Sequence, residues 1–327
     1  MLQARVYLTR PIPDAGIEML REQISDFHMN EEDRVLSREE LKQAVKGCDG
    51  ILSLLTDKMD AEVMDAAGPQ LKVIANYAVG FDNIDLQAAT ERGILVTNTP
   101  GVLTDATADF AWALLMATAR RIPESERYAR AGKYKAWGPK LFLGGDFVGR
   151  TLGIIGAGRI GSAMAKRATG WNMRILYTDV QPNPNIEKEV GAQFVDMDTL
   201  LKESDYISIH VPLTPETHHL IDEAALRKMK PTAYLVNTSR GPVIDEAALA
   251  RALKEKVIAG AGLDVFEEEP KIHSDLLELE NVVITPHIAS ATHETRNKMA
   301  TMAATNLIEA LRGNRPPNLV NVDVWKD

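Results

Sequence analysis

Three side chains suited to proton transfer and anion binding follow apolar runs in the second half of the 327-residue chain. Arg240 and His287 each come after a run of strand type, and Glu269 follows the run that ends at Asp264. An imidazole can give or take a proton near neutral pH, a carboxylate beside it favours the charged ring, and a guanidinium grips a carboxylate with two prongs. Together they suit the reduction of a 2-oxo acid, in which the alkoxide left by hydride transfer must gain a proton.

Each of these residues also has an ordinary structural explanation. A lone histidine at a strand end is more often structural than catalytic, a Glu-Glu-Glu run is usually a solvated surface, and an arginine in Ser-Arg-Gly can cap a helix. The catalytic interpretation gains weight because all three residues are expected at the carboxyl ends of strands, in a segment that also contains a dinucleotide-binding pattern.

That pattern is Gly156-x-Gly158-x-x-Gly161, with an apolar run before it and a helical pattern after it. The first glycine permits a tight turn, the second lets backbone N–H groups approach a pyrophosphate, and the third lets the helix pack close to the strand. Asp179 lies 18 residues beyond Gly161, at the end of the next predicted strand, where an acid binds the ribose hydroxyls in NAD sites. A glycine-rich turn in an ordinary strand–helix–strand unit is the alternative.

The elements that must position these residues alternate between strand and helix along almost the whole chain. Apolar runs predict strands at 5–8, 50–55, 71–77 and 94–97, and six more at 152–155, 173–177, 206–211, 233–237, 259–264 and 282–285. A long apolar helix is expected at 105–121, an aromatic-rich arm at 122–148 and a final helix at 293–312. Such alternation predicts an α/β protein with parallel sheets covered by helices on both faces.

Two loops in the first hundred residues also qualify as ligand sites, because ligands of such sheets bind beyond the carboxyl ends of strands. They lie at 54–56 and 76–82. Gly80 in the second loop would let backbone N–H groups face a small anion. A plain strand–helix connection is the alternative.

Composition narrows the functional classes. A length of 327 residues favours two domains, and the net charge of −9 argues against a nucleic-acid surface. The single Cys48 suits a reducing compartment, and the first residues lack the apolar core of a signal peptide. The most apolar run, at 110–119, is too short to cross a bilayer. We therefore expect a cytoplasmic protein with no membrane or nucleic-acid partner, and we predict no metal site.

The motifs resemble those of the D-2-hydroxyacid dehydrogenase family over nearly the whole chain. The resemblance rests on GAGRIG at 156–161, HVPLT at 210–214, NTSRG at 237–241, LDVFEEEP at 263–270 and PHI at 286–288. Within the family the chain is most similar to glyoxylate/hydroxypyruvate reductases, through AVGFDNID at 78–85, NTPGVLTDATAD at 98–109 and SAT at 290–292.

The resemblance implies two doubly wound parallel-sheet domains with the active site in the cleft between them. Residues 100–287 would form a Rossmann nucleotide-binding domain, and residues 1–99 plus 288–327 a flavodoxin-like substrate-binding (catalytic) domain. The implied function is NADH-dependent reduction of glyoxylate or hydroxypyruvate to glycolate or D-glycerate by a homodimer, to which the arm near Trp137 contributes. The alternatives are a reductase of another small 2-oxo acid such as 2-ketogluconate, a phosphite or formate dehydrogenase, and an NAD-sensing corepressor-like binding protein.

The resemblance also implies roles for individual residues. Arg240 would anchor the substrate, Glu269 would pair with the histidine, and His287 would be the acid/base. The implied NAD(H) contacts are Gly156, Gly158, Arg159, Ile160, Gly161, Asp179, His210, Val211, Pro212, Thr217, Thr238, Ser239, Arg240, Asp264, His287 and Ala289. The implied substrate contacts are Leu55, Val79, Gly80, Arg240, His287 and Ser290, with Val79 and Gly80 acting through backbone N–H groups. NADP-using relatives carry Ser-Arg or a similar pair at Asp179-Val180, so this chain is expected to prefer NAD.

Overall fold

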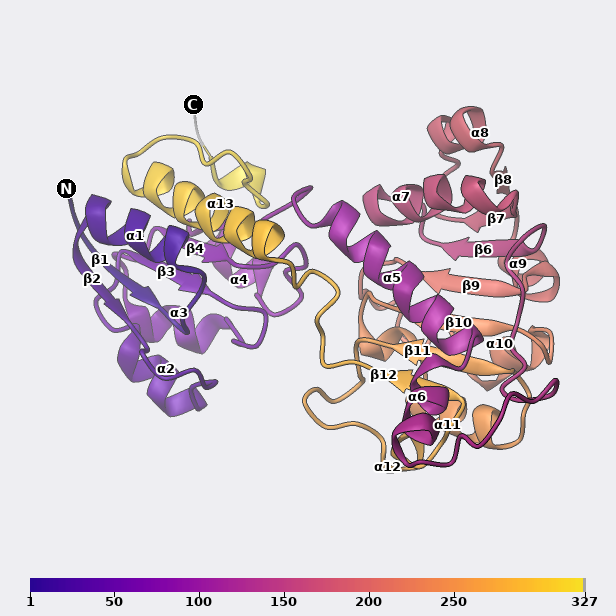
Figure 1. Cartoon of the computed structure of the whole chain (residues 1–327). Coiled ribbons are helices and arrows are strands. Elements are labelled where there is room, and N and C mark those ends of the chain that lie inside the picture. Colours follow the sequence, from indigo (N-terminus) through magenta and orange to yellow (C-terminus); the bar gives the residue numbers. More distant parts are fainter. Residues whose placement is uncertain (326–327) are drawn as a thin grey trace. The chain divides into compact units, whose positions relative to one another are not determined.

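The computed structural model describes residues 1–325, and the chain divides into two compact units (Figure 1). The first unit comprises Met1–Leu103 together with the chain from Ala291 onward, and the second comprises Thr104–Ser290. Each unit is built on one parallel sheet flanked by helices. The predicted α/β class with two parallel-sheet domains is therefore confirmed.

The sheet of the first unit has the strand order β2-β1-β3-β4-β5, which is the flavodoxin-like order. Its strands are β1 (Leu2–Leu8), β2 (Ile24–Met29), β3 (Gly50–Ser53), β4 (Val73–Asn76) and β5 (Leu95–Thr97). Every residue of β3 and β4 is buried, as expected for central strands covered on both faces. The sequence did not predict β2, because only Ile24 of this edge strand is buried.

Helices of the first unit include one from the far end of the chain. They are α1 (Asp14–Gln23), α2 (Arg38–Ala44), α3 (Ala61–Ala67), α4 (Leu86–Glu91) and α13 (His293–Leu311), with a short 3₁₀ turn at η3 (Val322–Val324). In Figure 1, α13 lies beside α1, and the two helices pack closely with β3 and β4 against α13. The last long helix thus completes the core of the first unit, with Met299, Ala303 and Leu307 buried in it.

The sheet of the second unit has seven strands in the order β12-β11-β10-β9-β6-β7-β8. They are β6 (Thr151–Ile155), β7 (Arg174–Thr178), β8 (Gln193–Phe194), β9 (Tyr206–Ile209), β10 (Tyr234–Asn237), β11 (Gly260–Leu263) and β12 (Val282–Ile284). The expectation of six strands was wrong by one. The extra strand, β8, is a two-residue edge strand with both residues exposed, so it left no hydrophobic pattern in the sequence.

Helices cover this second sheet, and the long α5 is buried along much of its length by packing on α7, β10 and β11. The helices are α5 (Thr104–Ala119), α6 (Ile122–Arg130), α7 (Arg159–Ala168), α8 (Pro184–Val190), α9 (Met197–Glu203), α10 (Glu223–Lys228), α11 (Glu246–Lys254) and α12 (Ser274–Leu277), with 3₁₀ turns at η1 (Thr169–Trp171) and η2 (Gly241–Val243). Aspartate side chains cap α3, α4, α9, α10 and α11 by accepting a backbone N–H in the first turn, which fixes where these helices begin.

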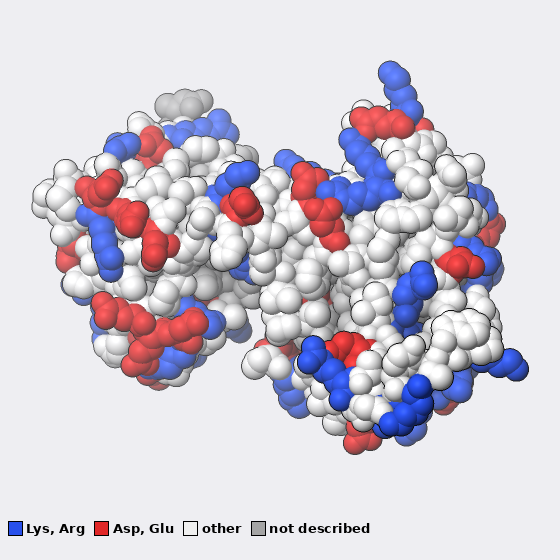
Figure 2. All heavy atoms as spheres, in the orientation of Figure 1, with Lys and Arg blue, Asp and Glu red and all other residues white. Residues whose placement is uncertain are grey.

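The surface carries charges of both signs. On the face shown in Figure 2, acidic side chains lie among basic ones over both units, so this face is of mixed charge rather than a basic surface. Within residues 1–325, no helix combines the length and the apolarity needed to cross a membrane.

The close approach of α1 and α13 generates a stability prediction. A Cβ atom on Gly16 would lie 2.9 Å from both the Cβ and the carbonyl oxygen of Ala300. Gly16→Ala gains up to about 1 kcal/mol of helix propensity but incurs about 1–3 kcal/mol of overpacking, so we expect a net loss of stability. Thermal unfolding should show a Tm several degrees lower, whereas Glu18→Ala on the exposed side of α1 should change little. A higher Tm for Gly16→Ala would contradict this prediction, because it would mean that α1 and α13 have room for the added methyl group.

Candidate active site

The glycine-rich loop between β6 and α7 has the geometry that the sequence pattern predicts. Gly156 adopts a left-handed backbone with φ 91°, and a Cβ there would lie 2.8 Å from the His210 carbonyl group. A Cβ on Gly161 would collide with the carbonyl oxygen of Gly156. In contrast, a Cβ on Gly158, which precedes the first turn of α7, would meet no described atom within 4 Å. The loop is therefore tightly packed at Gly156 and Gly161 and open at Gly158. The open position lies at the N-terminus of α7, where an anion would bind. Arg159 and Ile160 are the first residues of α7.

Asp179, just after β7, is held against this loop. Its Oδ2 accepts a hydrogen bond of 2.7 Å from the Ala157 N–H, and its Oδ1 accepts one of 2.7 Å from the Val180 N–H. Asn183 supports the loop as well, because its Nδ2 donates to the carbonyl oxygen of Ala157 at 2.7 Å. Asn183 is not among the residues predicted from the sequence, although an asparagine before a proline at a helix start is a capping signal.

The loop after β9 supplies His210, Val211, Pro212 and Thr217. The His210 Nε2 lies 2.8 Å from the Ser208 Oγ, and burial lowers the pKa of His210 to about 4. The ring is therefore neutral at physiological pH and unsuited to act as a cationic anchor. Thr217 donates from its hydroxyl to the carbonyl oxygen of Pro212 at 2.6 Å and accepts the Thr214 N–H at 2.8 Å, so it closes this loop on itself.

The loop after β10 carries Thr238, Ser239 and Arg240. The Asn237 side chain shapes it, because its Oδ1 accepts hydrogen bonds from the N–H and the hydroxyl of Ser239 and its Nδ2 donates to the Arg240 carbonyl oxygen. The Thr238 hydroxyl is buried, and within residues 1–325 it has no hydrogen-bond partner. A buried hydroxyl of this kind fits a bound ligand that offers it a polar group.

His287 and Glu269 form the predicted acid/base pair. The His287 Nδ1 lies 2.9 Å from the Glu269 Oε2, and the two side chains are 27% and 30% exposed. Burial opposes ionisation of Glu269, but the hydrogen bond and charge of His287, the Phe266 N–H and the charge of Arg240 outweigh it and hold the pKa of Glu269 below its usual range. The carboxylate is thus charged at neutral pH. With Nδ1 committed to Glu269, Nε2 is the ring nitrogen available for proton transfer.

Asp264, at the end of β11, holds the turn that carries His287. Its carboxylate accepts hydrogen bonds from the Ile288 N–H at 2.9 Å, the Ala289 N–H at 2.8 Å and the Thr285 hydroxyl at 2.7 Å. The His287 N–H donates to the Asp264 carbonyl oxygen at 2.8 Å. His287 has a left-handed backbone with φ 53°, which a non-glycine residue adopts only at a cost. Burial is the largest influence on Asp264 and raises its pKa, against the lowering effect of these donors and of His287.

The first unit carries a candidate anion site of its own, the loop after β4 with Val79 and Gly80. Their carbonyl oxygens accept hydrogen bonds from the Asn98 and Asn76 side chains, at 2.7 and 2.9 Å. Among the described residues, the N–H groups of Val79 and Gly80 donate no hydrogen bond. Adjacent free N–H groups on a loop of this kind suit a small anion. Leu55, after β3, is half-buried.

The structure brings the predicted residues of the second unit to one edge of its sheet. The carboxyl ends of the parallel strands are followed by the glycine loop, Asp179, His210, Arg240, Asp264, Glu269 and His287. The half-buried Ser290 follows the turn that Asp264 holds. Three features of this edge suit a dinucleotide: open space before α7, a carboxylate beside the glycine loop, and the buried Thr238 hydroxyl, which has no partner among the described residues. The residues fit NAD(H), and the roles of individual residues stay predictions.

Comparison with known proteins agrees with this geometry. Residues 112–289 match the family model of the D-isomer specific 2-hydroxyacid dehydrogenase NAD binding domain. A protein of Korarchaeum cryptofilum named glyoxylate reductase is 57% identical over 327 residues, covering 99% of this chain and 98% of the relative. A crystal structure of a Thermus thermophilus protein superposes with a TM-score of 0.91 at 48% identity, over 97% of this chain and 99% of that one.

A third relative uses the other nicotinamide cofactor. The crystal structure of an NADPH-dependent glyoxylate/hydroxypyruvate reductase from Sinorhizobium meliloti superposes with a TM-score of 0.83 at 32% identity, over 97% of this chain and 98% of that one. The chain belongs to the D-isomer specific 2-hydroxyacid dehydrogenase family. The predicted family, the NAD-binding domain and the enzyme class of an NAD(P)-dependent oxidoreductase are thereby confirmed.

The Asp264 turn generates a prediction that separates positioning from stability. Asp264→Asn replaces one acceptor oxygen with an NH₂ group that faces backbone donors, leaving buried N–H groups unpaired at a cost of about 1–3 kcal/mol. We expect a lower Tm and a kcat for 2-oxo acid reduction at least ~10²-fold lower, because His287 loses its orientation. Asp205→Asn is the matched control, since the Asp205 carboxylate also accepts a backbone N–H, that of Thr151 at the start of β6, and pairs with Lys230 rather than with the His287 turn. Equal kcat values for the two variants would contradict the positioning role.

Proposed function

We propose that this enzyme reduces glyoxylate and hydroxypyruvate to glycolate and D-glycerate with NADH. The observation that carries the proposal is the His287–Glu269 pair, with its 2.9 Å contact, at the same sheet edge as the glycine-rich loop. The names of the relatives from Korarchaeum cryptofilum and Sinorhizobium meliloti support this substrate class.

The chain's own residues would carry the proton and hold the substrate. NADH, when bound, supplies the hydride to the carbonyl carbon of the 2-oxo acid. The Nε2–H of protonated His287 gives its proton to the carbonyl oxygen, which becomes the hydroxyl of the product. The Glu269 carboxylate stabilises the charged ring at Nδ1 and fixes its orientation. In the reverse direction, neutral His287 takes the hydroxyl proton.

Two groups are proposed to bind the substrate carboxylate. The Arg240 guanidinium can grip it with two parallel N–H donors, and the N–H groups of Val79 and Gly80 offer a second donor pair. In this proposal residues 1–99 plus 288–327 form the substrate-binding domain, and residues 100–287 form the NAD-binding domain. Ser290 and Leu55 are proposed to border the bound substrate.

The test of the acid/base pair is a kinetic comparison with glyoxylate, hydroxypyruvate and a panel of other 2-oxo acids. We expect NADH oxidation to be fastest with the first two, and His287→Ala to lower kcat by about 10²–10⁴-fold. The affinity for NADH should barely change. Glu269→Gln removes the charge that favours the imidazolium, so the alkaline limb of the kcat/KM profile for reduction should move to lower pH. Full activity in His287→Ala would falsify the assignment.

Cofactor preference is proposed to depend on Asp179. Its carboxylate can accept hydrogen bonds from ribose hydroxyls, whereas the 2′-phosphate of NADP would bring like charges together at a cost of about 4 kcal/mol per unit pair at ~4 Å and an effective dielectric of ~20. Solvent reduces this repulsion, and we expect a preference for NADH of ~10²-fold or more in kcat/KM. Val180 is 91% exposed and offers no cation.

Comparing kcat/KM for NADH and NADPH measures this preference directly. Asp179→Ser/Val180→Arg should shift it toward NADPH, and Asp179→Asn, which removes only the charge, should weaken it. Equal use of both cofactors by the wild-type enzyme would mean that Asp179 merely supports the glycine loop.

The arm at 122–148 is proposed to pair with a second copy of the chain in a cytoplasmic homodimer. Trp137, Leu143 and Tyr134 are 80%, 67% and 58% exposed, and α6 has no buried residue. An exposed apolar surface of this kind marks an interface, and two-fold self-association is the commonest way to cover it. Light scattering after gel filtration should report a dimer for the wild type and more monomer for Trp137→Ser/Leu143→Ser, with Phe194→Ser on the exposed edge strand as control. A monomeric wild type would exclude the proposal.

A further inference from the structure

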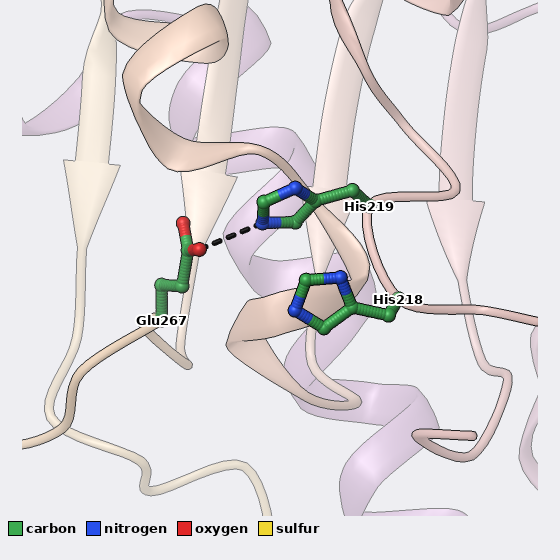
Figure 3. A group of neighbouring side chains, drawn as sticks. All are labelled: His218, His219 and Glu267. Carbon is green, nitrogen blue, oxygen red and sulfur yellow. Dashed lines mark hydrogen bonds and ion pairs between the residues drawn. The ribbon is translucent and has the colours of Figure 1, made fainter. Parts of the chain in front are cut away.

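Outside the acid/base pair, three possible metal ligands meet on the surface of the second unit (Figure 3). His218 and His219 lie in the loop between β9 and α10, and Glu267 follows β11. The His219 Nε2 lies 2.7 Å from the Glu267 Oε1, and the two imidazole rings stack with centroids 4.1 Å apart. One ligand atom of each side chain lies within 4.8 Å of the other two.

The backbone and a buried carboxylate hold two of these ligands in place. The Glu267 Oε2 accepts the Glu246 N–H at 3.1 Å, and the Glu267 N–H donates to the Glu246 Oε2 at 2.7 Å. Glu246 is only 6% exposed. The His219 N–H donates to the Pro242 carbonyl oxygen at 2.8 Å, and His219 adopts a left-handed backbone with φ 51°. Such supporting hydrogen bonds are typical of residues that orient metal ligands.

We propose that His218, His219 and Glu267 bind a divalent transition-metal ion of the zinc class. Two imidazole nitrogens and one carboxylate oxygen are a ligand set that Zn²⁺ uses, with solvent in the fourth position. At Zn–N and Zn–O bonds of ~2.1 Å, tetrahedral ligands stand about 3.4 Å apart. The 2.7 Å contact lies below that separation and the 4.8 Å limit lies above it, so the ligand atoms are near tetrahedral spacing, and binding one ion requires the side chains to rotate.

This site is separate from the acid/base pair, although the chain links the two. Glu267 precedes Glu269 by two residues, but Glu269 binds His287 whereas Glu267 binds His219. No metal site is predicted from the sequence, and only the fold brings Glu267 to His218 and His219. None of the three ligands is among the residues proposed to bind the substrate or the cofactor.

The test is calorimetric titration of ZnCl₂ into the tag-free, chelator-treated full chain in a non-coordinating buffer. We expect one ion per chain, and each of His218→Ala, His219→Ala and Glu267→Gln should weaken binding at least about tenfold. His218 is exposed, and its removal should leave folding intact, which an unchanged Tm without zinc verifies. Wild-type protein should gain Tm on zinc addition, whereas His218→Ala should gain much less.

Two controls make the result specific. His28→Ala removes an exposed histidine that also pairs with a carboxylate, Asp26 at 2.6 Å, but has no second histidine beside it in the described structure, and zinc affinity should stay unchanged. His287→Ala should leave the affinity unchanged as well. Any of three results would overturn the proposal: no zinc binding by the wild type, unchanged zinc affinity in His218→Ala, or zinc binding that is lost in His287→Ala but kept in His218→Ala.

Discussion

The hydrogen bonds from the following turn to the Asp264 carboxylate are the constraint on which the candidate active site depends. A histidine with a left-handed backbone is unfavourable in isolation, so the turn at His287 persists only because its surroundings impose it. Three donors converge on the carboxylate, and the His287 N–H returns to the Asp264 carbonyl oxygen. The strand end of β11 thereby directs the imidazole toward Glu269, and this backbone arrangement produces the His287–Glu269 contact that is proposed as the acid/base pair.

The same principle organises the cofactor side of the sheet. Gly156 can turn sharply only without a side chain, because the His210 backbone lies directly behind it. Asp179 then ties the loop to the end of β7 through the Ala157 N–H, so the group proposed to select the cofactor also shapes the glycine-rich loop. Substitutions at this aspartate must therefore be compared by cofactor ratio rather than by activity alone.

Much of the fold and of the candidate site could be predicted from the sequence. Buried parallel strands appear in the sequence as apolar runs, and the carboxyl ends of these strands lie at the same edge of the sheet. Arg240, Glu269 and His287 are predicted on that basis and stay predictions, whereas the fold class, which follows from strand–helix alternation, is confirmed. Edge strands were missed: β2 and β8 bury almost nothing and leave no hydrophobic period. The clamp by Asp264 and the contact of His219 with Glu267 were missed as well, since both depend on left-handed turns at residues whose types do not require them.

A double-mutant cycle between Asp264 and His287 tests the central claim most directly. If the Asp264 carboxylate acts by positioning the imidazole, kcat for glyoxylate reduction should fall in Asp264→Asn and in His287→Ala, and the double variant should be no slower than His287→Ala alone. The two effects would then be fully coupled. Independent effects that multiply in the double variant would contradict the account, because they would mean that Asp264 contributes to the reaction without His287.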